Sequence, residues 1–258
     1  MHNALEVSIA TLSKVGGRKR NEDSCGHWAQ SGQICCVLSD GAGGHGGGDV
    51  ASKLAVDAIL AAFQEAPEVS PQKALELLEL ANQTVIAHQG DRHEQQDMRA
   101  TLVVLLISEA LSQSVWAHIG DSRLYAFRGG SQFFQTKDHS VFQSMIDAGF
   151  VKPSAARESS QRTILTGSLG GEDGFTPEIT EALQAVKSGD AFLLCSDGFW
   201  EYVSESEMER LMQRVASPQD WLEQMEQVLL ANKRDGHDNY SAIAIWYGAM
   251  DFATRIVG

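Results

Sequence analysis

The sequence predicts an α+β fold, a central β-sandwich of two antiparallel sheets flanked by pairs of helices in a four-layer α-β-β-α arrangement. Segments of strand character follow one another in runs joined by short turns, as in antiparallel hairpins. Helical periodicity is confined to two groups, near residues 49–90 and 205–230. With 258 residues, 43% of them hydrophobic, the chain can bury a large core. We find no linker, low-complexity tract or repeat, so we expect a single domain over residues 1–258.

The predicted strands are short apolar or alternating segments bounded by turn residues. The first, over residues 5–13, alternates apolar and polar side chains along part of its length. Gly129 and Gly130 predict a two-residue hairpin turn between neighbouring strands. A short apolar run typical of a buried strand lies at residues 34–38, and further strands are predicted at residues 101–108, 114–120, 124–128, 131–136, 191–197 and 241–247.

The predicted helices have apolar residues at helical spacing. In residues 49–63 these include Val56, Ile59 and Phe63. A second helix is expected to begin at Ser70-Pro71, an N-cap followed by proline, and to stop near Gly90. Further helices are predicted at residues 140–149, 205–215 and 218–230.

Composition excludes several classes of function. A net charge of −14 argues against nonspecific binding to nucleic acid or an anionic membrane. No apolar stretch approaches the roughly 20 residues that span a bilayer, and the N-terminus does not resemble a secretory signal. The four cysteines have no CxxC spacing, so they predict reduced core residues in a cytoplasmic protein and no zinc site.

The segment VLSDGAGGHGGGDV suggests a binding function. Asp40 ends an apolar run, and six of the next eight residues are glycine. Glycine allows φ > 0 and a close approach to the backbone, so such turns cradle phosphates or metal ions. A P-loop is excluded, because no Lys-Ser/Thr follows the glycines. A flexible turn with a solvated aspartate is the alternative that this segment alone leaves open.

The pattern recurs along the chain. LLCSDG repeats the apolar strand ending in Ser-Asp-Gly, and other acidic residues stand beside predicted strands in RKRNED, HIGDSR and GHDN. Carboxylates gathered at one rim repel one another unless a cation neutralises them or a proton is retained. Without a His/Cys ligand set, Mg²⁺ or Mn²⁺ is favoured. Two such ions can activate a water as nucleophile, so no catalytic Ser or Cys is needed.

RKRNED, SDGAGGH, GDSR, DHS, SDGFW and GHDN, in this order and spacing, resemble the metal-dependent protein serine/threonine phosphatases (the protein phosphatase 2C, or PPM, family) in their bacterial form. The match covers about residues 5–247. The resemblance implies a β-sandwich flanked by helix pairs. It also implies two Mn²⁺ or Mg²⁺ ions and phosphorylated proteins as substrates.

The resemblance also implies a metal-binding set. Asp40 would bridge both ions and Gly41 would offer its carbonyl oxygen to one of them, while Asp197 and Asp238 would bind the other. Asp121 would help to hold a third, weaker ion. The structural alternative is that these aspartates are turn residues, or in the case of Asp121 a turn cap.

Other residues receive supporting roles from the same resemblance. Arg18 would bind the substrate phosphate as a bidentate fork, unless it belongs to a solvated basic cluster. Glu22 and Asp23 would act on the metals through water, and Glu22 has a plain surface residue as its alternative. Asn239 would orient Asp238 or a metal-bound water. Arg123 is expected to form a structural ion pair.

The sequence departs from the family in places. Many animal members have a histidine where this chain has Ala42, and His45 either braces the glycine loop or protonates the leaving group. Residues 142–171 match the position of the family's flap beside the active site. Bacterial relatives often have an arginine where this chain has Gly167. The basic residues that could compensate are Arg157 and Arg162.

We therefore expect a cytoplasmic, monomeric bacterial phosphatase that opposes a partner Ser/Thr kinase and binds neither nucleic acid nor membrane. Its size and family suggest a link to type VI secretion control. One alternative is a phosphatase of anti-anti-sigma regulators. Another is an inactive module that binds phosphoproteins, against which the intact set of aspartates and Arg18 argues. His27, His88, His93 and His118 are read as surface or packing residues.

Overall fold

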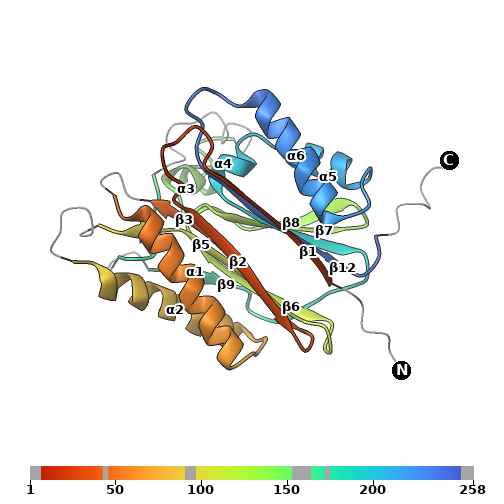
Figure 1. Ribbon diagram of the computed structural model, residues 1–258, viewed down its shortest axis with the longest axis horizontal. Helices are drawn as coiled ribbons and strands as arrows, with labels where there is room; N and C mark the ends of the chain where they lie inside the picture. The colour runs from red at the N-terminus through yellow and green to blue at the C-terminus, as the bar shows by residue number, and fades with distance from the viewer. Residues whose placement is uncertain (1–6, 43–45, 91–96, 153–163, 172–174, 251–258) are drawn as a thin grey trace.

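The computed structural model describes residues 7–42, 46–90, 97–152, 164–171 and 175–250. Two antiparallel β-sheets pack face to face, and helices cover both outer faces (Figure 1). The predicted four-layer α-β-β-α sandwich is thereby confirmed.

The first sheet has five strands in the order β1-β12-β11-β7-β8. It joins the two ends of the described chain, because β12 lies between β1 and β11. Alternate side chains of β12 face opposite sides of this sheet and all are buried, which explains its largely apolar sequence. The strands are β1 (Val7–Lys14), β7 (Arg123–Arg128), β8 (Ser131–Gln135), β11 (Asp190–Cys195) and β12 (Tyr240–Tyr247).

The second sheet has seven strands, five of them in the order β10-β6-β5-β3-β2, with β4 on β3 and β9 on β6. The central strand β5 is buried along its whole length. The strands are β2 (Asp23–Gln30), β3 (Gln33–Ala42), β4 (Arg99–Ala100), β5 (Leu102–Ser108), β6 (Gln113–Ile119), β9 (Glu178–Ile179) and β10 (Gln184–Ala185).

Helices α1 (Gly48–Glu65) and α2 (Pro71–His88) pack on the second sheet through one apolar cluster. Helices α4 (Asp197–Trp200), α5 (Glu205–Met212) and α6 (Pro218–Asn232) share another with the first sheet. A third cluster fills the space between the two sheets. Helix α3 (Val141–Asp147) lies at one end of the sandwich (Figure 1).

Local signals in the sequence place the helix starts. Ser70 accepts a hydrogen bond from the backbone N–H of Lys73 at 3.0 Å, as the Ser-Pro pair predicted. Ser204 and Glu207 form a capping box at the start of α5. Each cap accepts hydrogen bonds from N–H groups that have no partner within the helix, so the capping residue determines where the helix begins.

Turn residues account for the hairpins. Gly129 and Gly130 have φ of 58° and 78°, which confirms the predicted two-residue turn between β7 and β8. The strand β2, with the sequence DSCGHWAQ, was not predicted, because it lacks an apolar run or clear alternation. It forms by pairing with β3 through a turn at Ser31 and Gly32, where φ is 52° and 73°.

Two predictions drawn from composition can be compared with the structure. All four cysteines are free, and Cys35, Cys36 and Cys195 lie in the core as expected. Within the described ranges, no helix is both long and apolar enough to cross a bilayer.

Candidate active site

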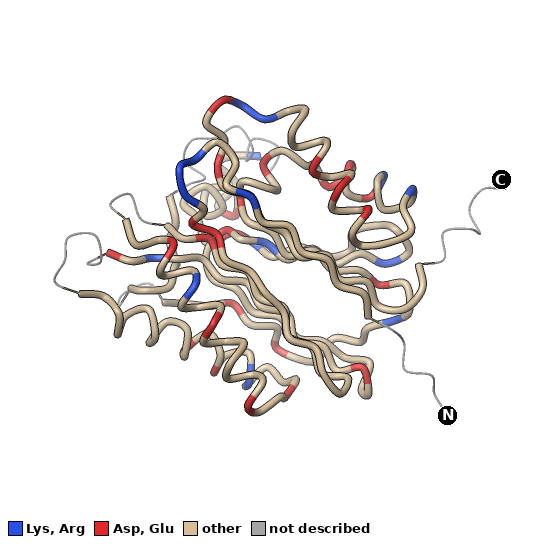
Figure 2. Tube along the Cα trace, viewed as in Figure 1, with Lys and Arg blue, Asp and Glu red and all other residues tan. Residues whose placement is uncertain are grey.

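An acidic pocket of about 410 Å³ lies where strand ends of the two sheets meet. Figure 2 shows acidic segments gathered at these strand ends, beside the basic loop between β1 and β2. Apart from Asp23, which is buried beside it, the residues predicted to bind metal or phosphate line this pocket: Arg18, Glu22, Asp40, Gly41, Asp121, Asp197 and Asp238. Residues up to 220 positions apart in sequence are thus brought together, as the pair Arg18 and Asp238 shows.

The strand register places Asp40. It pairs across strands with Asp23, so the two carboxylates arise at the same end of the β2–β3 hairpin. Thr101 holds the backbone of Asp40 twice. Its Oγ1 accepts from the Asp40 N–H at 3.0 Å, and its own N–H donates to the Asp40 carbonyl at 2.8 Å. Sequence reasoning missed Thr101, because a threonine before an apolar strand carries no functional signal.

The serines of the two Ser-Asp-Gly motifs are structural. Ser39 Oγ donates to the Thr101 carbonyl at 2.6 Å, which closes the clamp on Asp40. Ser196 Oγ donates to Asp23 Oδ2 at 2.8 Å and accepts from the Ser241 N–H at 3.0 Å. The repetition of the motif was the signal that could have identified both serines, since each hydroxyl at the end of a buried strand donates to a group on a neighbouring strand or segment.

The glycine of each motif allows a close approach of two backbones. A Cβ on Gly41 would overlap the carbonyl of Gly48 at the start of α1, and one on Gly198 would overlap the carbonyl of Asn239. Gly41 also donates its N–H to the Glu22 carbonyl at 3.0 Å. Glycine is therefore required by packing at both places, independently of any ligand.

Asn239 ties the Arg18 loop to the last strand. Its side-chain amide donates to the carbonyls of Val15 and Arg20 at 2.7 and 2.8 Å, and its Oδ1 accepts from the Glu22 N–H at 2.8 Å. Only its backbone N–H contacts the carboxylate of Asp238, at 2.8 Å. The Asn239 side chain thus clamps the loop rather than contacting Asp238, and its predicted contact with a metal-bound water stays a prediction.

Arg18 reaches the carboxylate cluster directly. Its Nη2 lies 2.6 Å from Asp238 Oδ2, and both side chains remain partly exposed, at 55% and 40%. A solvated basic cluster was the alternative for this residue. The contact shows instead that the guanidinium points at the acidic pocket, where it can donate to an anionic oxygen.

Burial and mutual repulsion raise the pKa of the carboxyls in the pocket. The pKa of Asp40 is raised well above its usual value by desolvation first and then by the neighbouring aspartates. Desolvation also raises the pKa of Asp121 strongly, with Asp197 as the next cause, and it raises the pKa of Asp23 to about 7. Among the described residues, the carboxyls of the site therefore repel one another in their ionised form more than nearby cations stabilise them.

The residues present fit bound divalent cations. The carboxylate, amide and hydroxyl groups that line the pocket have lone pairs on oxygen, which is the donor atom that Mg²⁺ and Mn²⁺ prefer. The buried Oδ1 of Asp23 has no hydrogen-bond partner among the described residues, although a buried carboxylate oxygen normally has one. A cation, with its water ligands, would satisfy both the unpaired oxygen and the repulsion between the carboxyls.

A buried network supports Asp121 from behind. Trp200 Nε1 donates to the Asp121 carbonyl at 2.9 Å, and the guanidinium of Arg123 stacks on the Trp200 ring at 3.5 Å. Arg123 forms a two-pronged ion pair with Asp138 at 2.7 and 2.8 Å. This confirms the structural ion pair predicted for Arg123.

Part of the predicted site cannot be placed. His45, Arg157 and Arg162 lie outside the described residues. Ala42 lines the pocket and Leu165, from the 142–171 segment, faces it as well. Gly167 is buried, so an arginine at this position would need a different local backbone packing.

Comparison with known proteins decides the family. Residues 13–236 match the family model described as Protein phosphatase 2C. The chain belongs to the protein phosphatase 2C family. It is a protein serine/threonine phosphatase, which confirms the resemblance seen in the sequence motifs.

Bacterial relatives of this 2C phosphatase match over most of its length. Protein phosphatase PhpP of Streptococcus pneumoniae is 32% identical, with 93% of this chain and 97% of that protein covered. The catalytic domain of PstP in complex with two manganese ions has a TM-score of 0.78 at 26% identity, covering 94% of this chain and 98% of that one. PppA, described as a regulatory component of type VI secretion in Pseudomonas aeruginosa, has a TM-score of 0.70 at 27% identity, covering 95% and 100%.

Proposed function

We propose that this 2C phosphatase hydrolyses phosphoserine and phosphothreonine in proteins, with divalent cations held by Asp40, Gly41, Asp197 and Asp238. The observation that carries the proposal is the acidic pocket, where these residues lie beside Arg18. Glu22 and Asp23 act through water, and Asp121 is assigned to a third, weaker ion. Two Mn²⁺ or Mg²⁺ ions would neutralise phosphoryl oxygens and lower the pKa of a water that attacks phosphorus.

The protein's own residues bind and orient the substrate. The Arg18 guanidinium contacts the carboxylate cluster through Asp238. To bind a phosphate it exchanges Asp238 for two phosphate oxygens, and its partly exposed side chain leaves room for that movement. The Asn239 hydrogen bond and the close packing at Gly41 hold the backbone around the pocket in place while Arg18 changes partner.

Metal removal tests the proposal. We expect hydrolysis of a phosphothreonine peptide in the presence of Mn²⁺ or Mg²⁺ and none in EDTA, with activity restored by adding the metal back. The expected reason is that, among the described residues that line the pocket, the hydroxyl group belongs to Thr101, which is engaged with the Asp40 N–H and with Ser122, whereas the carboxylates can hold a metal that activates water. The assay follows release of inorganic phosphate, and circular dichroism in EDTA checks that the protein stays folded. Activity that persists in EDTA would contradict the metal mechanism, and folded protein inactive with either metal would favour the phosphoprotein-binding module.

Arg18→Ala should mainly weaken phosphate binding. We expect KM to rise about tenfold or more with a smaller change in kcat, because a charge-assisted bidentate contact is worth about 1.5–3 kcal/mol. Lys19→Ala removes a neighbouring charge from the same loop and is the matched control. Steady-state kinetics on the phosphothreonine peptide measures both constants. An unchanged KM in Arg18→Ala would place Arg18 outside the substrate site.

The cellular context belongs to the same proposal. We assign the phosphatase to the cytoplasm as a monomer formed by one catalytic domain over residues 1–258, with residues 142–171 as a flap. Its free cysteines suit a reducing compartment. Opposition to a Ser/Thr kinase follows from the reaction, and the likeness to PppA supports a type VI secretion system as the pathway. Phosphoproteomics after deletion of the gene should then show increased phosphorylation on that system's components.

A further inference from the structure

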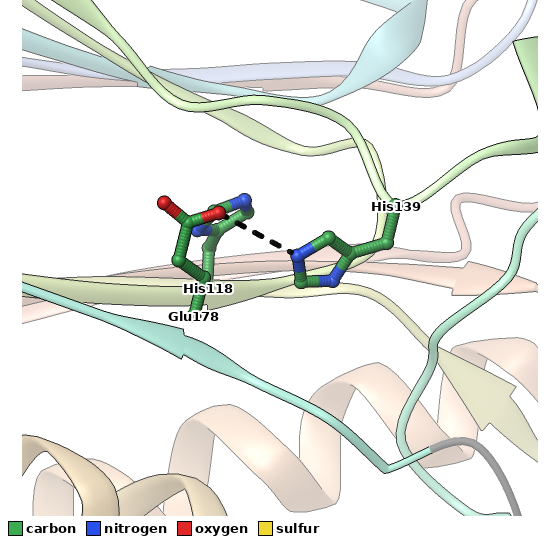
Figure 3. A group of neighbouring side chains, drawn as sticks. All are labelled: His118, His139 and Glu178. Atoms are coloured by element: carbon green, nitrogen blue, oxygen red, sulfur yellow. Dashed lines mark ion pairs between the residues drawn. The ribbon is translucent and has the colours of Figure 1, made fainter. Parts of the chain in front are cut away.

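Two histidines and a glutamate converge at the edge of the sandwich, away from the acidic pocket. Figure 3 shows His118, His139 and Glu178 turned toward one another. One ring nitrogen of each histidine and one carboxylate oxygen of Glu178 all lie within 4.8 Å of one another. His118 and Glu178 open on a cavity of about 470 Å³, which shares no lining residue with the acidic pocket.

The fold places these three side chains by backbone pairing. His118 on β6 and Glu178 on β9 are direct cross-strand partners, so their side chains project on the same side. His139 follows β8, and its backbone N–H donates to the Gly120 carbonyl at 2.9 Å. The carbonyl of His139 accepts from the Thr166 N–H at 2.8 Å, which fixes the residue from a second side.

Hydrogen bonding prepares His118 as a ligand. Its Nε2 lies 2.7 Å from the carbonyl of Lys137, so this nitrogen carries the proton and Nδ1 keeps its lone pair. Histidines that bind metals usually donate the other ring N–H to a carbonyl or carboxylate in this way. Burial lowers the pKa of His118, and burial together with His118 lowers the pKa of His139 to about 4. Both rings are therefore neutral near pH 7, without a proton to displace from His118 Nδ1.

We propose that His118, His139 and Glu178 bind one divalent transition-metal ion of the Zn²⁺ type, separately from the cations of the catalytic pocket. Two imidazole nitrogens and one carboxylate oxygen form a ligand set that Zn²⁺ accepts with a fourth, open position. Imidazole ligands favour Zn²⁺ over Mg²⁺, whereas the acidic pocket presents oxygen donors. The ligand chemistry alone therefore separates the two sites.

Binding requires a short inward movement. Ligand atoms around a tetrahedral Zn²⁺ with bonds of about 2.0–2.1 Å stand about 3.3 Å apart. His139 Nε2 and Glu178 Oε2 are now 4.0 Å apart, as the dashed line in Figure 3 marks. The Glu178 side chain is 59% exposed and can move inward, while His118 is fixed in the core.

The movement also reaches the loop that carries Asp121. The Gly120 N–H donates to His139 Nδ1 over 3.3 Å, a long contact that leaves Nε2 protonated in the metal-free ring. Coordination through Nε2 requires the other tautomer, so this contact must open. Gly120 directly precedes Asp121, and an occupied site therefore changes the hydrogen bonding beside the catalytic pocket.

Titration of the protein in excess Mg²⁺ tests the site, because Mg²⁺ occupies oxygen ligands and competes poorly for imidazole. Zn²⁺ is added by isothermal titration calorimetry, and Co²⁺ is added in parallel to record its visible absorption, which is intense for tetrahedral coordination. The variants Glu178→Gln and His139→Gln each remove one ligand. Glu181→Gln, an exposed glutamate that lines the same cavity, is the matched control.

We expect a Zn²⁺-binding step and a tetrahedral Co²⁺ spectrum, with a Kd for this step at least about tenfold weaker in both ligand variants but unchanged in Glu181→Gln. Thermal unfolding without metal should be alike in Glu178→Gln and the control, which excludes misfolding as the cause. Zn²⁺ binding that is equally tight in the wild type and in both ligand variants would overturn the proposal. Absence of Zn²⁺ binding in the presence of Mg²⁺ would overturn it as well.

Discussion

Replacing Asp40 with asparagine should abolish turnover and at the same time raise the Tm of the metal-free protein. Turnover should fall about a thousandfold or more, because divalent cations contribute several kcal/mol to such reactions and each 1.36 kcal/mol is tenfold in rate. Stability should rise because asparagine keeps the shape of Asp40 without its charge. Desolvation and the neighbouring aspartates raise the pKa of Asp40, so above its usual pKa the folded state is destabilised, either by the buried charge or by the cost of taking up a proton.

The two effects are measured separately. Phosphate release with Mn²⁺ reports turnover, and thermal unfolding in EDTA at pH 7.5 reports stability. Mn²⁺ should raise the Tm of the wild type far more than that of Asp40→Asn, since ligand binding to the folded state stabilises it. Asp57→Asn, an exposed residue on α1 paired with Lys53, is the control and should change neither quantity strongly. Full turnover in Asp40→Asn would disprove the metal-bridging role of Asp40.

Arg123→Met should cause the largest loss of stability among single changes near the pocket. Arg123 and Asp138 are each only 8% exposed, so removing the guanidinium leaves a buried carboxylate without its partner. Such losses amount to about 3–5 kcal/mol. Tyr125 Oη also loses the hydrogen bond from Arg123 Nη1, at 3.0 Å, and Trp200 loses its stacked cation. Urea unfolding of the metal-free protein measures the change in the free energy of unfolding.

A double variant separates the ion pair from simple loss of packing. Arg123→Met combined with Asp138→Leu should be more stable than Arg123→Met alone, because no unpaired charge remains in the interior. If the single variant lost less than about 1 kcal/mol, the pair would count as a surface-type ion pair. A double variant less stable than the single one would show that Asp138 has other partners of greater weight.

The sequence predicted the layers and most of the pocket for a physical reason. Buried strands are apolar, so an apolar run in the sequence indicates each of them. A carboxylate that directly follows such a run must lie at the end of the strand. Asp40 and Asp197 were found in this way. Helix starts were equally visible, because caps such as Ser70 are local chemistry.

The parts that the sequence did not predict depend on contacts between distant segments. Strand β2 has no pattern of its own and exists through its pairing with β3. The clamp formed by Asn239 joins residues 217–224 positions apart, and Thr101 holds Asp40 from 61 positions away. His118 and Glu178 likewise meet only through strand pairing, and His139 joins them through its backbone contact with Gly120. Of the three, only His118 was named from the sequence, as a surface or packing residue.

The position of β12 determines when the phosphatase can first work during its synthesis. This strand is made late but lies in the interior of its sheet, between β1 and β11. While β12 is still inside the ribosome, the edges of β1 and β11 that pair with it are unpaired. The pocket then also lacks Asp238 and the Asn239 clamp. Pairings of such high contact order form slowly. The complete pocket and the pairing of these exposed strand edges therefore form together, once β12 has left the ribosome.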